Sequence, residues 1–270
     1  MRVLLRSQKL VIALIAWIVV FAVRTDRASA TIIGPDAFGY TATDAVAFSF
    51  VDISGTGTQR LAGTDDTATT ESMGFNFDFY GTTYNSISWS TNGLLTLGGT
   101  NANFSNVDLT TTSPSSDLPS IATLWDDWNF NALNPGSDAT YFQTLGAPGS
   151  QQFVVQWNDA FRFATSPSGV TFEAILFEGS NDILFQYLDV NAGNFSSNGA
   201  SSTVGIRDTG GEGNGRNLQW SFNSAVITDQ QAIRFSPSPS SPPVIPEPGS
   251  FSLIGLGLIG LGWRRRHKTL

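Results

Sequence analysis

The stretch Phe75-Asn76-Phe77-Asp78-Phe79 alternates strictly between apolar and polar residues. Successive side chains of a β-strand point to opposite faces of a sheet, so this alternation places three phenylalanines on one face. The stretch therefore predicts a strand that buries one face and exposes the other.

Further runs of strand type follow at short intervals along the chain. They are 45–53, 84–90, 94–97, 121–125, 140–144, 153–157, 170–177, 183–188, 203–206, 218–222 and 232–235. Gly, Asn, Ser or Pro separates most of them, and Thr91-Asn92-Gly93 predicts a tight turn because Asn-Gly tolerates positive φ. No convincing helix pattern interrupts the series. About twelve short strands with polar turns predict an all-β fold, a single antiparallel β-sandwich.

The first thirty residues have the layout of a secretory signal peptide. Its parts in order are a basic start, an apolar run and small residues before a cut: Arg2, Arg6 and Lys9; 10–23; Ala28 and Ala30. The apolar run is shorter than the roughly 20 residues that span a bilayer, although an uncleaved N-terminal anchor stays an alternative. We expect export through the Sec machinery and a mature chain that starts at Thr31.

The C-terminal end of the sequence carries a second targeting segment. Residues 236–245 are rich in Ser and Pro and predict an extended spacer, because proline fixes φ and removes amide donors. Three elements follow in order: the triplet Pro246, Glu247 and Pro248; an apolar stretch over 249–263; and the basic cluster Arg264, Arg265 and Arg266. The apolar stretch predicts a short hydrophobic helix, marginal for a permanent span. The positive-inside rule keeps the arginines cytoplasmic and the body outside the inner membrane.

This ordered tail resembles the PEP-CTERM sorting signal of Gram-negative bacteria. The resemblance implies recognition by exosortase, a membrane transpeptidase-like enzyme that cuts near the triplet. It further implies that residues 249–263 lie in the inner membrane transiently, and that the body is then released or re-attached at the cell surface or in the extracellular polysaccharide matrix. A tail anchor that is never processed is the alternative, since bilayer thinning tolerates a short span.

These boundaries divide the chain into a signal peptide (1–30), a β-sandwich body (31–235), a Ser/Pro linker (236–245) and a sorting signal (246–270). The chain has no cysteine, and its lysines and single histidine lie near its ends, at Lys9, His267 and Lys268. A mature body without Cys, His or Lys cannot form Ser-His-Asp or Cys-His triads, Schiff bases, or zinc sites built on His or Cys. We therefore expect no enzymatic activity.

The body is strongly acidic. Residues 31–243 contain five arginines, no lysine and 20 carboxylates, hence a formal net charge of −15. Nucleic acid is a poor partner for this surface, because phosphate contacts need Lys and Arg.

Several strand and turn segments, taken in order, resemble nidogen-like (NIDO) extracellular domains and their bacterial relatives. These segments are 74–77, 79–81, 90–97, 124–127, 153–157, 172–178, 182–187, 204–207 and 232–235. The resemblance implies a β-rich extracellular adhesion or matrix module, and it transfers no catalytic motif.

The most pointed local feature is Trp125-Asp126-Asp127-Trp128. Neighbouring strand residues face opposite sides, so Asp126 and Asp127 cannot share a pocket if the strand continues through them. A structural corner, in which one carboxylate accepts backbone amides, is the favoured interpretation. A glycosidase pair with Glu173 or Glu178 is the weaker alternative.

The sequence also contains two kinds of candidate ligand site, an aromatic ring and groups of acidic residues. Trp128 is the best candidate for an exposed ring that stacks on sugars, although burial is the commoner role of a tryptophan. Calcium takes oxygen ligands, so the loop with Asp208 and Glu212 is a second candidate, and Asp126 and Asp127 are further candidate ligands. That loop fails the EF-hand pattern, and it and Asp65-Asp66 are more simply solvated turns. We expect no cofactor, with calcium as the alternative.

The sequence thus predicts a non-catalytic structural or adhesive protein that is exported to the cell surface or matrix. Its expected partners are exosortase, the Sec machinery and extracellular polysaccharide. A carbohydrate-binding module is the main alternative. A glycoside hydrolase is less favoured, as is an ice-binding protein, because the Thr clusters lack a sustained period.

Overall fold

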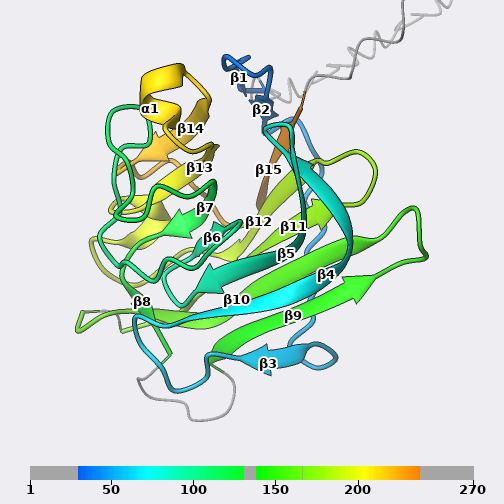
Figure 1. Cartoon of the computed structure of the whole chain (residues 1–270). Coiled ribbons are helices and arrows are strands. Elements are labelled where there is room, and N and C mark those ends of the chain that lie inside the picture. Colours follow the sequence, from blue (N-terminus) through cyan, green and yellow to red (C-terminus); the bar gives the residue numbers. More distant parts are fainter. Residues whose placement is uncertain (1–29, 131–137, 166, 238–270) are drawn as a thin grey trace, which may run out of the picture.

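The computed structural model describes residues 30–130, 138–165 and 167–237, and Figure 1 shows their arrangement. Two antiparallel β-sheets pack against each other as a sandwich, which confirms the all-β expectation. Residues 1–29 of the expected signal peptide and the apolar stretch over 249–263 lie outside the described residues. Within the described residues, no helix combines the length and apolar character needed to cross a membrane.

The large sheet has nine strands. Its order is β1 (Ile32–Ile33), β2 (Thr41–Thr43), β15 (Gln231–Ser236), β12 (Ile183–Asp189), β11 (Val170–Phe177), β10 (Gln152–Arg162), β9 (Ala139–Leu145) and β3 (Thr58–Arg60), with β8 (Trp128–Asn129) paired to the end of β10. The small sheet has six strands in the order β14 (Asn217–Phe222), β13 (Thr203–Arg207), β7 (Ser120–Trp125), β6 (Leu94–Thr96), β5 (Thr82–Ser90) and β4 (Ala68–Phe79).

The core fills the space between the two sheets. Phe75, Phe77 and Phe79 on β4 are buried, and the residues between them are exposed, as the alternation predicts. On the large sheet, the rings of Trp157 and Phe172 stack with centroids 5.0 Å apart. Burial of large apolar side chains, worth roughly 1.5–3 kcal/mol each, stabilises this cysteine-free domain.

Residues 45–53, in which Val46, Phe48 and Phe50 alternate with other residues, do not form the expected strand. The segment crosses the outer face of the large sheet and packs Val51 and Ile53 on a second apolar cluster, together with Val154 and Ile175. Eleven of the twelve expected strands are present. The structure adds the short strands β1, β2, β3 and β8, a single turn of helix α1 (Gly211–Asn214), and a 3₁₀ turn over Ser197–Gly199.

The strand registers define two ends of the sandwich. We call one end of the sandwich the far end. There β7 finishes at Trp125, β10 at Arg162 and β12 at Asp189, and β15 begins at Gln231. At the tail end β15 finishes at Ser236, from which the chain continues toward its C-terminus. In Figure 1, β8 marks the far end, and α1 lies at the tail end.

Candidate functional site

Three segments meet at the far end: the loop 64–67, the turn 91–93 and the corner 125–130. Backbone hydrogen bonds join them, since the amide of Asp126 donates to the carbonyl of Asn92 at 3.1 Å, and further amides in the corner and the turn donate to the loop. The expected tight turn is present, and it is held against the corner. This junction places the acidic residues of the loop beside those of the corner.

Asp126 forms the structural corner that the sequence predicts. Strand β7 ends at Trp125 and the chain then turns, so the two aspartates do not continue a strand. The buried carboxylate of Asp126 accepts the amide of Asp127 at 2.8 Å and the Ser201 hydroxyl. It also lies 2.9 Å from Nε of Arg162. Burial raises its pKa, against the lowering effects of Ser201 and Arg162. All of its contacts are internal to the fold.

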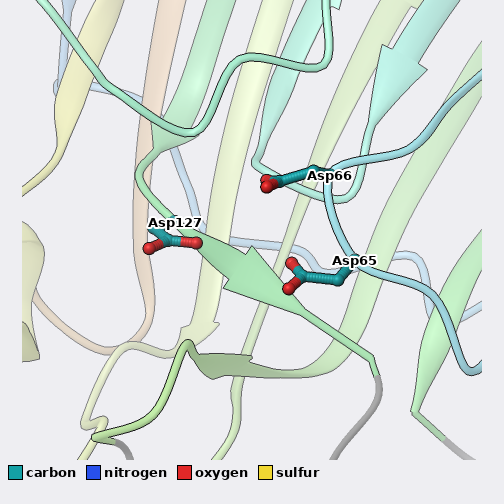
Figure 2. A group of neighbouring side chains, drawn as sticks. All are labelled: Asp65, Asp66 and Asp127. Carbon is teal, nitrogen blue, oxygen red and sulfur yellow. The ribbon is translucent and has the colours of Figure 1, made fainter.

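Asp127 faces the opposite side and joins Asp65 and Asp66. Carboxylate oxygens of these three residues all lie within 4.8 Å of one another, and Figure 2 shows the side chains turned toward a common space. Asp127 is also paired to Nη1 of Arg162 at 2.9 Å, while Asp66 accepts the side-chain amide of Asn92 at 2.9 Å. We call Asp65, Asp66 and Asp127 the acidic cluster.

The electrostatics of the acidic cluster are unfavourable without a counter-charge. Burial, followed by the charge of Asp66, raises the pKa of Asp65. Burial also raises the pKa of Asp127, with Arg162 opposing it and the other two aspartates reinforcing it. Oδ1 of Asp65 has no hydrogen-bond partner among the described residues. Among the described residues, Arg162 is the one arginine paired with this site, and it is shared between Asp126 and Asp127.

The acidic cluster is where the described residues could hold a hard cation such as calcium, which prefers carboxylate oxygens. Acidic groupings are common on a chain with this much negative charge, so calcium binding stays a prediction. Of the residues expected to bind calcium, the cluster includes Asp127.

Trp128 does not lie on the surface, contrary to the expectation that it is the best-exposed tryptophan. Its side chain is 0 % exposed, and Nε1 donates to the carbonyl of Leu124 at 2.6 Å. The turn at residues 126–127 brings Trp128 into register with Arg162 on β10 and directs the indole into the core. It cannot stack on a sugar in this position.

Most of the exposed large apolar side chains lie on loops and strand ends at the far end instead. Of the six large apolar residues that are exposed in the described chain, five lie here: Phe104, Phe163, Leu188, Phe195 and Val226. Phe163 is held at this end because its amide donates to the carbonyl of Asp127 at 2.9 Å. The loop of Phe195 lies against the same turn, since Nδ2 of Asn194 donates to Oγ1 of Thr165 at 3.2 Å. We call these five residues the far-end patch.

Comparison with known proteins assigns most of the chain. Residues 39–242, which include both sheets except β1, match the NIDO-related family. The chain belongs to the NIDO-related family. Residues 244–266 match the PEP-CTERM protein-sorting motif, as the order of the triplet, the apolar stretch and the arginines predicts. No curated protein and no solved structure matches the chain.

The sorting motif indicates where this NIDO-related protein is exported. Proteins with this motif are exported and associated with the cell surface in Gram-negative bacteria, and exosortase processes them. The matched region includes Pro246, Glu247 and Pro248 together with Arg264, Arg265 and Arg266. These residues, like Ala28 of the expected signal peptide, lie outside the described structure.

The other expected calcium ligands lie at the tail end of the NIDO-related domain. Asp208 is paired with Arg216 at 2.7 Å, and Glu212 is paired with the buried Arg207. Each carboxylate is therefore neutralised by an arginine, and neither joins Asp126 or the acidic cluster. Within the loop 208–215, residues Gly211–Asn214 form the short helix α1.

In the structure, Glu173 and Glu178 lie apart from Asp127, the residue with which each would form a glycosidase pair. Glu173 is 0 % exposed on the outer face of the large sheet, beneath residues 49–53. Glu178 accepts the amides of Gly149 and Gln151 at 2.7 and 2.9 Å, beyond the tail-end terminus of β11. Neither residue can face Asp127 across a substrate.

Two features of the site have no signal in the sequence. The acidic cluster joins an Asp-Asp loop to a corner about sixty residues later, and this contact depends on the pairing of the small sheet. Phe163 and Phe195 follow strand or loop residues of ordinary type, and only the register of β10 and the loop contact bring them to one end.

Proposed function

We propose that this NIDO-related protein is a non-catalytic adhesive or structural component of the cell surface or the extracellular polysaccharide matrix. Its partners would contact the far-end patch. The observation that supports this proposal is that the patch lies opposite Ser236, the end from which the chain continues to the sorting motif.

A protein attached or guided by its C-terminal tail presents its opposite end to the surroundings. Most of the exposed large apolar side chains of the described residues lie at this one end, and exposed apolar surface marks an interaction site where it is contiguous. Binding residues also concentrate on loops held by a rigid scaffold, as Phe163 and Phe195 are here. The patch is therefore placed where a matrix or surface partner would meet it.

The expected site carboxylates that lie outside the acidic cluster support a role without catalysis. Asp126 is locked by internal hydrogen bonds, Glu173 is covered, and Asp208 and Glu212 are neutralised by arginines. The body also lacks the His, Cys and Lys residues that most nucleophilic mechanisms use.

The proposal is tested by replacing Phe163 and Phe195 together with Ser in the exported protein. We expect the variant to leave the surface or matrix fraction for the medium, with a thermal unfolding midpoint close to that of the wild type. The matched control is Ile32→Ser, which removes an exposed apolar side chain from edge strand β1, away from the far end. Equal retention of all three proteins would contradict the proposal.

A carbohydrate-binding module is the second candidate, and Phe195 is the observation that favours it. The ring is 65 % exposed and follows the half-buried Asn194, and an exposed aromatic ring beside a polar side chain gives a sugar a surface on which to stack. Phe195→Ala would then abolish binding to purified exopolysaccharide, and Ile32→Ser would not. Binding that survives Phe195→Ala would contradict this second candidate.

A further inference from the structure

Two contacts join Thr31 and Asp44 at the outer edge of the large sheet. The backbone nitrogen of Thr31 lies 2.6 Å from Oδ1 of Asp44, and the amide of Asp44 donates to the carbonyl of Thr31 at 3.3 Å. The pairing of β1 with β2, which aligns Ile32 with Thr43, continues through these contacts. Asp44 therefore contacts the chain at the residue where the mature protein is expected to start.

Cleavage after Ala30 would change the chemistry of this contact. In the uncleaved chain the nitrogen of Thr31 is a neutral amide that can donate one hydrogen bond. After cleavage it becomes an α-amine, ordinarily with a pKa of about 7.7–8.0, and is largely charged at neutral pH. Hydrogen bonds between an ammonium and a carboxylate are shorter and roughly twice as strong as neutral ones.

We infer that Asp44 is a binding site for the α-ammonium group of Thr31, formed when the signal peptide is removed. This inference rests on the export that the proposed function requires, and it goes further by assigning both the first residue of the mature chain and its partner. Binding of the new terminus would hold β1 on the sheet edge.

The surrounding charges leave Asp44 available for this role. Strand β1 pairs with β2, and β2 pairs with β15, where Arg234 lies opposite Thr43. Arg234 is itself 3.5 Å from Asp182, and no described arginine is paired with Asp44. Strand β14, which also approaches β2, carries no charged residue.

The composition makes the α-amine unusually easy to observe. Residues 31–243 contain no lysine, so a chain cut after Ala30 and near the PEP triplet has its α-amine as its sole primary amine. A chain that keeps its C-terminus has a second, from Lys268. Amine-specific labelling thus reports on Thr31 and counts the processing events.

The test uses the protein purified after export from an exosortase-containing host. Mass spectrometry of the N-terminal peptide identifies the first residue. The rate of reaction with an amine-specific reagent is then measured from pH 6 to 10, in wild type, in Asp44→Asn and in the control Asp189→Asn. Asp189 is an exposed aspartate at the far end of β12.

We expect a start at Thr31 and labelling near pH 7.5 that is about threefold slower in wild type and Asp189→Asn than in Asp44→Asn, as half a unit of pKa gives. Equal rates in all three proteins, or a start at another residue, would overturn the inference and leave the adhesive proposal untouched. Purified protein that keeps residues 1–30 would overturn the inference together with signal-peptide removal. The Phe163 and Phe195 variants separately decide the adhesive proposal.

Discussion

Oε1 of Glu173 accepts a hydrogen bond from the backbone amide of Val51 at 3.0 Å, across 122 residues of chain. Similar hydrogen bonds, from a backbone amide to a side-chain oxygen, lie on both sides of this one. Oε1 of Gln186 accepts the amide of Ser49 at 2.6 Å, and Oε1 of Gln156 accepts the amide of Ile53 at 2.8 Å. Gln156, Glu173 and Gln186 are register partners on β10, β11 and β12. They form a polar row across the sheet that binds every second amide of the crossing segment.

This polar row explains why the expected strand at 45–53 is wrong. The alternation of the segment through Val46 and Phe48 agrees with the structure, but it does not continue, because Val51 and Ile53 pack on the second apolar cluster and Asp52 is exposed. The amides of the segment need acceptors, and a neighbouring strand is the usual source, but here side chains supply them. Gln156, Glu173 and Gln186 each interrupt an apolar run, which is the visible signal of a buried polar role. Their pairing with residues 49–53 depends on sheet register and could not be predicted.

Glu173→Gln is expected to stabilise the protein at alkaline pH. Burial raises the pKa of Glu173 from 4.5 to about 8. A carboxyl group with a raised pKa contributes stability that is complete below its ordinary pKa and is lost as the pH rises through the folded-state value. Wild-type stability should therefore fall between about pH 5 and pH 8, whereas Gln keeps an acceptor for Val51 without ionising.

Urea unfolding at pH 6, 7, 8 and 9 measures this effect. We expect the variant to exceed the wild type by about 1–3 kcal/mol at pH 9, the usual cost of an uncompensated buried polar group. Glu178→Gln is the control, since Glu178 lies in a turn outside the polar row. Parallel pH profiles for wild type and Glu173→Gln would refute the assignment.

Gln156→Leu is expected to loosen residues 49–53. The substitution removes the acceptor for the amide of Ile53 and leaves that buried donor without a partner. Such a donor costs about 1–3 kcal/mol. Faster amide hydrogen exchange at Val51 and Ile53, with β11 unaffected, would show it. Gln143→Leu, at an exposed contact with Thr56, should change neither, and slow exchange in Gln156→Leu would exclude a role in holding the segment.

The turn at Thr91-Asn92-Gly93 is a feature that the sequence predicts well, because its geometry is local. Gly93 has a φ of +75°, and a Cβ added there would lie 2.5 Å from the carbonyl oxygen of Leu124. The position therefore excludes side chains for two separate reasons, backbone strain and contact with β7. The second reason is not local, and it appears only once the turn is packed on the corner.

Gly93→Ala should destabilise the protein by more than backbone strain alone, by about 2–4 kcal/mol. Thermal unfolding measures the change. Gly55→Ala is the matched control, because Gly55 has open space around its Cβ position and no positive φ, so its variant should unfold near the wild-type temperature. Similar thermal unfolding midpoints for the two variants would show that neither backbone strain nor contact with β7 restricts position 93.

The candidate site was less predictable than the fold. The corner at Asp126 follows from the end of a strand and from two successive aspartates, both visible in the sequence. The burial of Trp128 and the meeting of Asp65 with Asp127 depend on how the chain turns after β7, which no periodic pattern records.

Asp66→Asn is expected to stabilise the protein in chelator-treated, low-salt buffer. The substitution removes one of three converging negative charges and keeps an oxygen for the side-chain amide of Asn92. Asp66 is exposed, so the gain should be modest, about 0.5 kcal/mol, and should shrink as salt screens the repulsion. Asp189→Asn, an exposed aspartate outside the acidic cluster, should show no such gain. A bound calcium ion would reverse this order, because a cation between the carboxylates offsets their mutual repulsion. If Asp66→Asn is less stable than the wild type once millimolar calcium is added, the acidic cluster binds calcium.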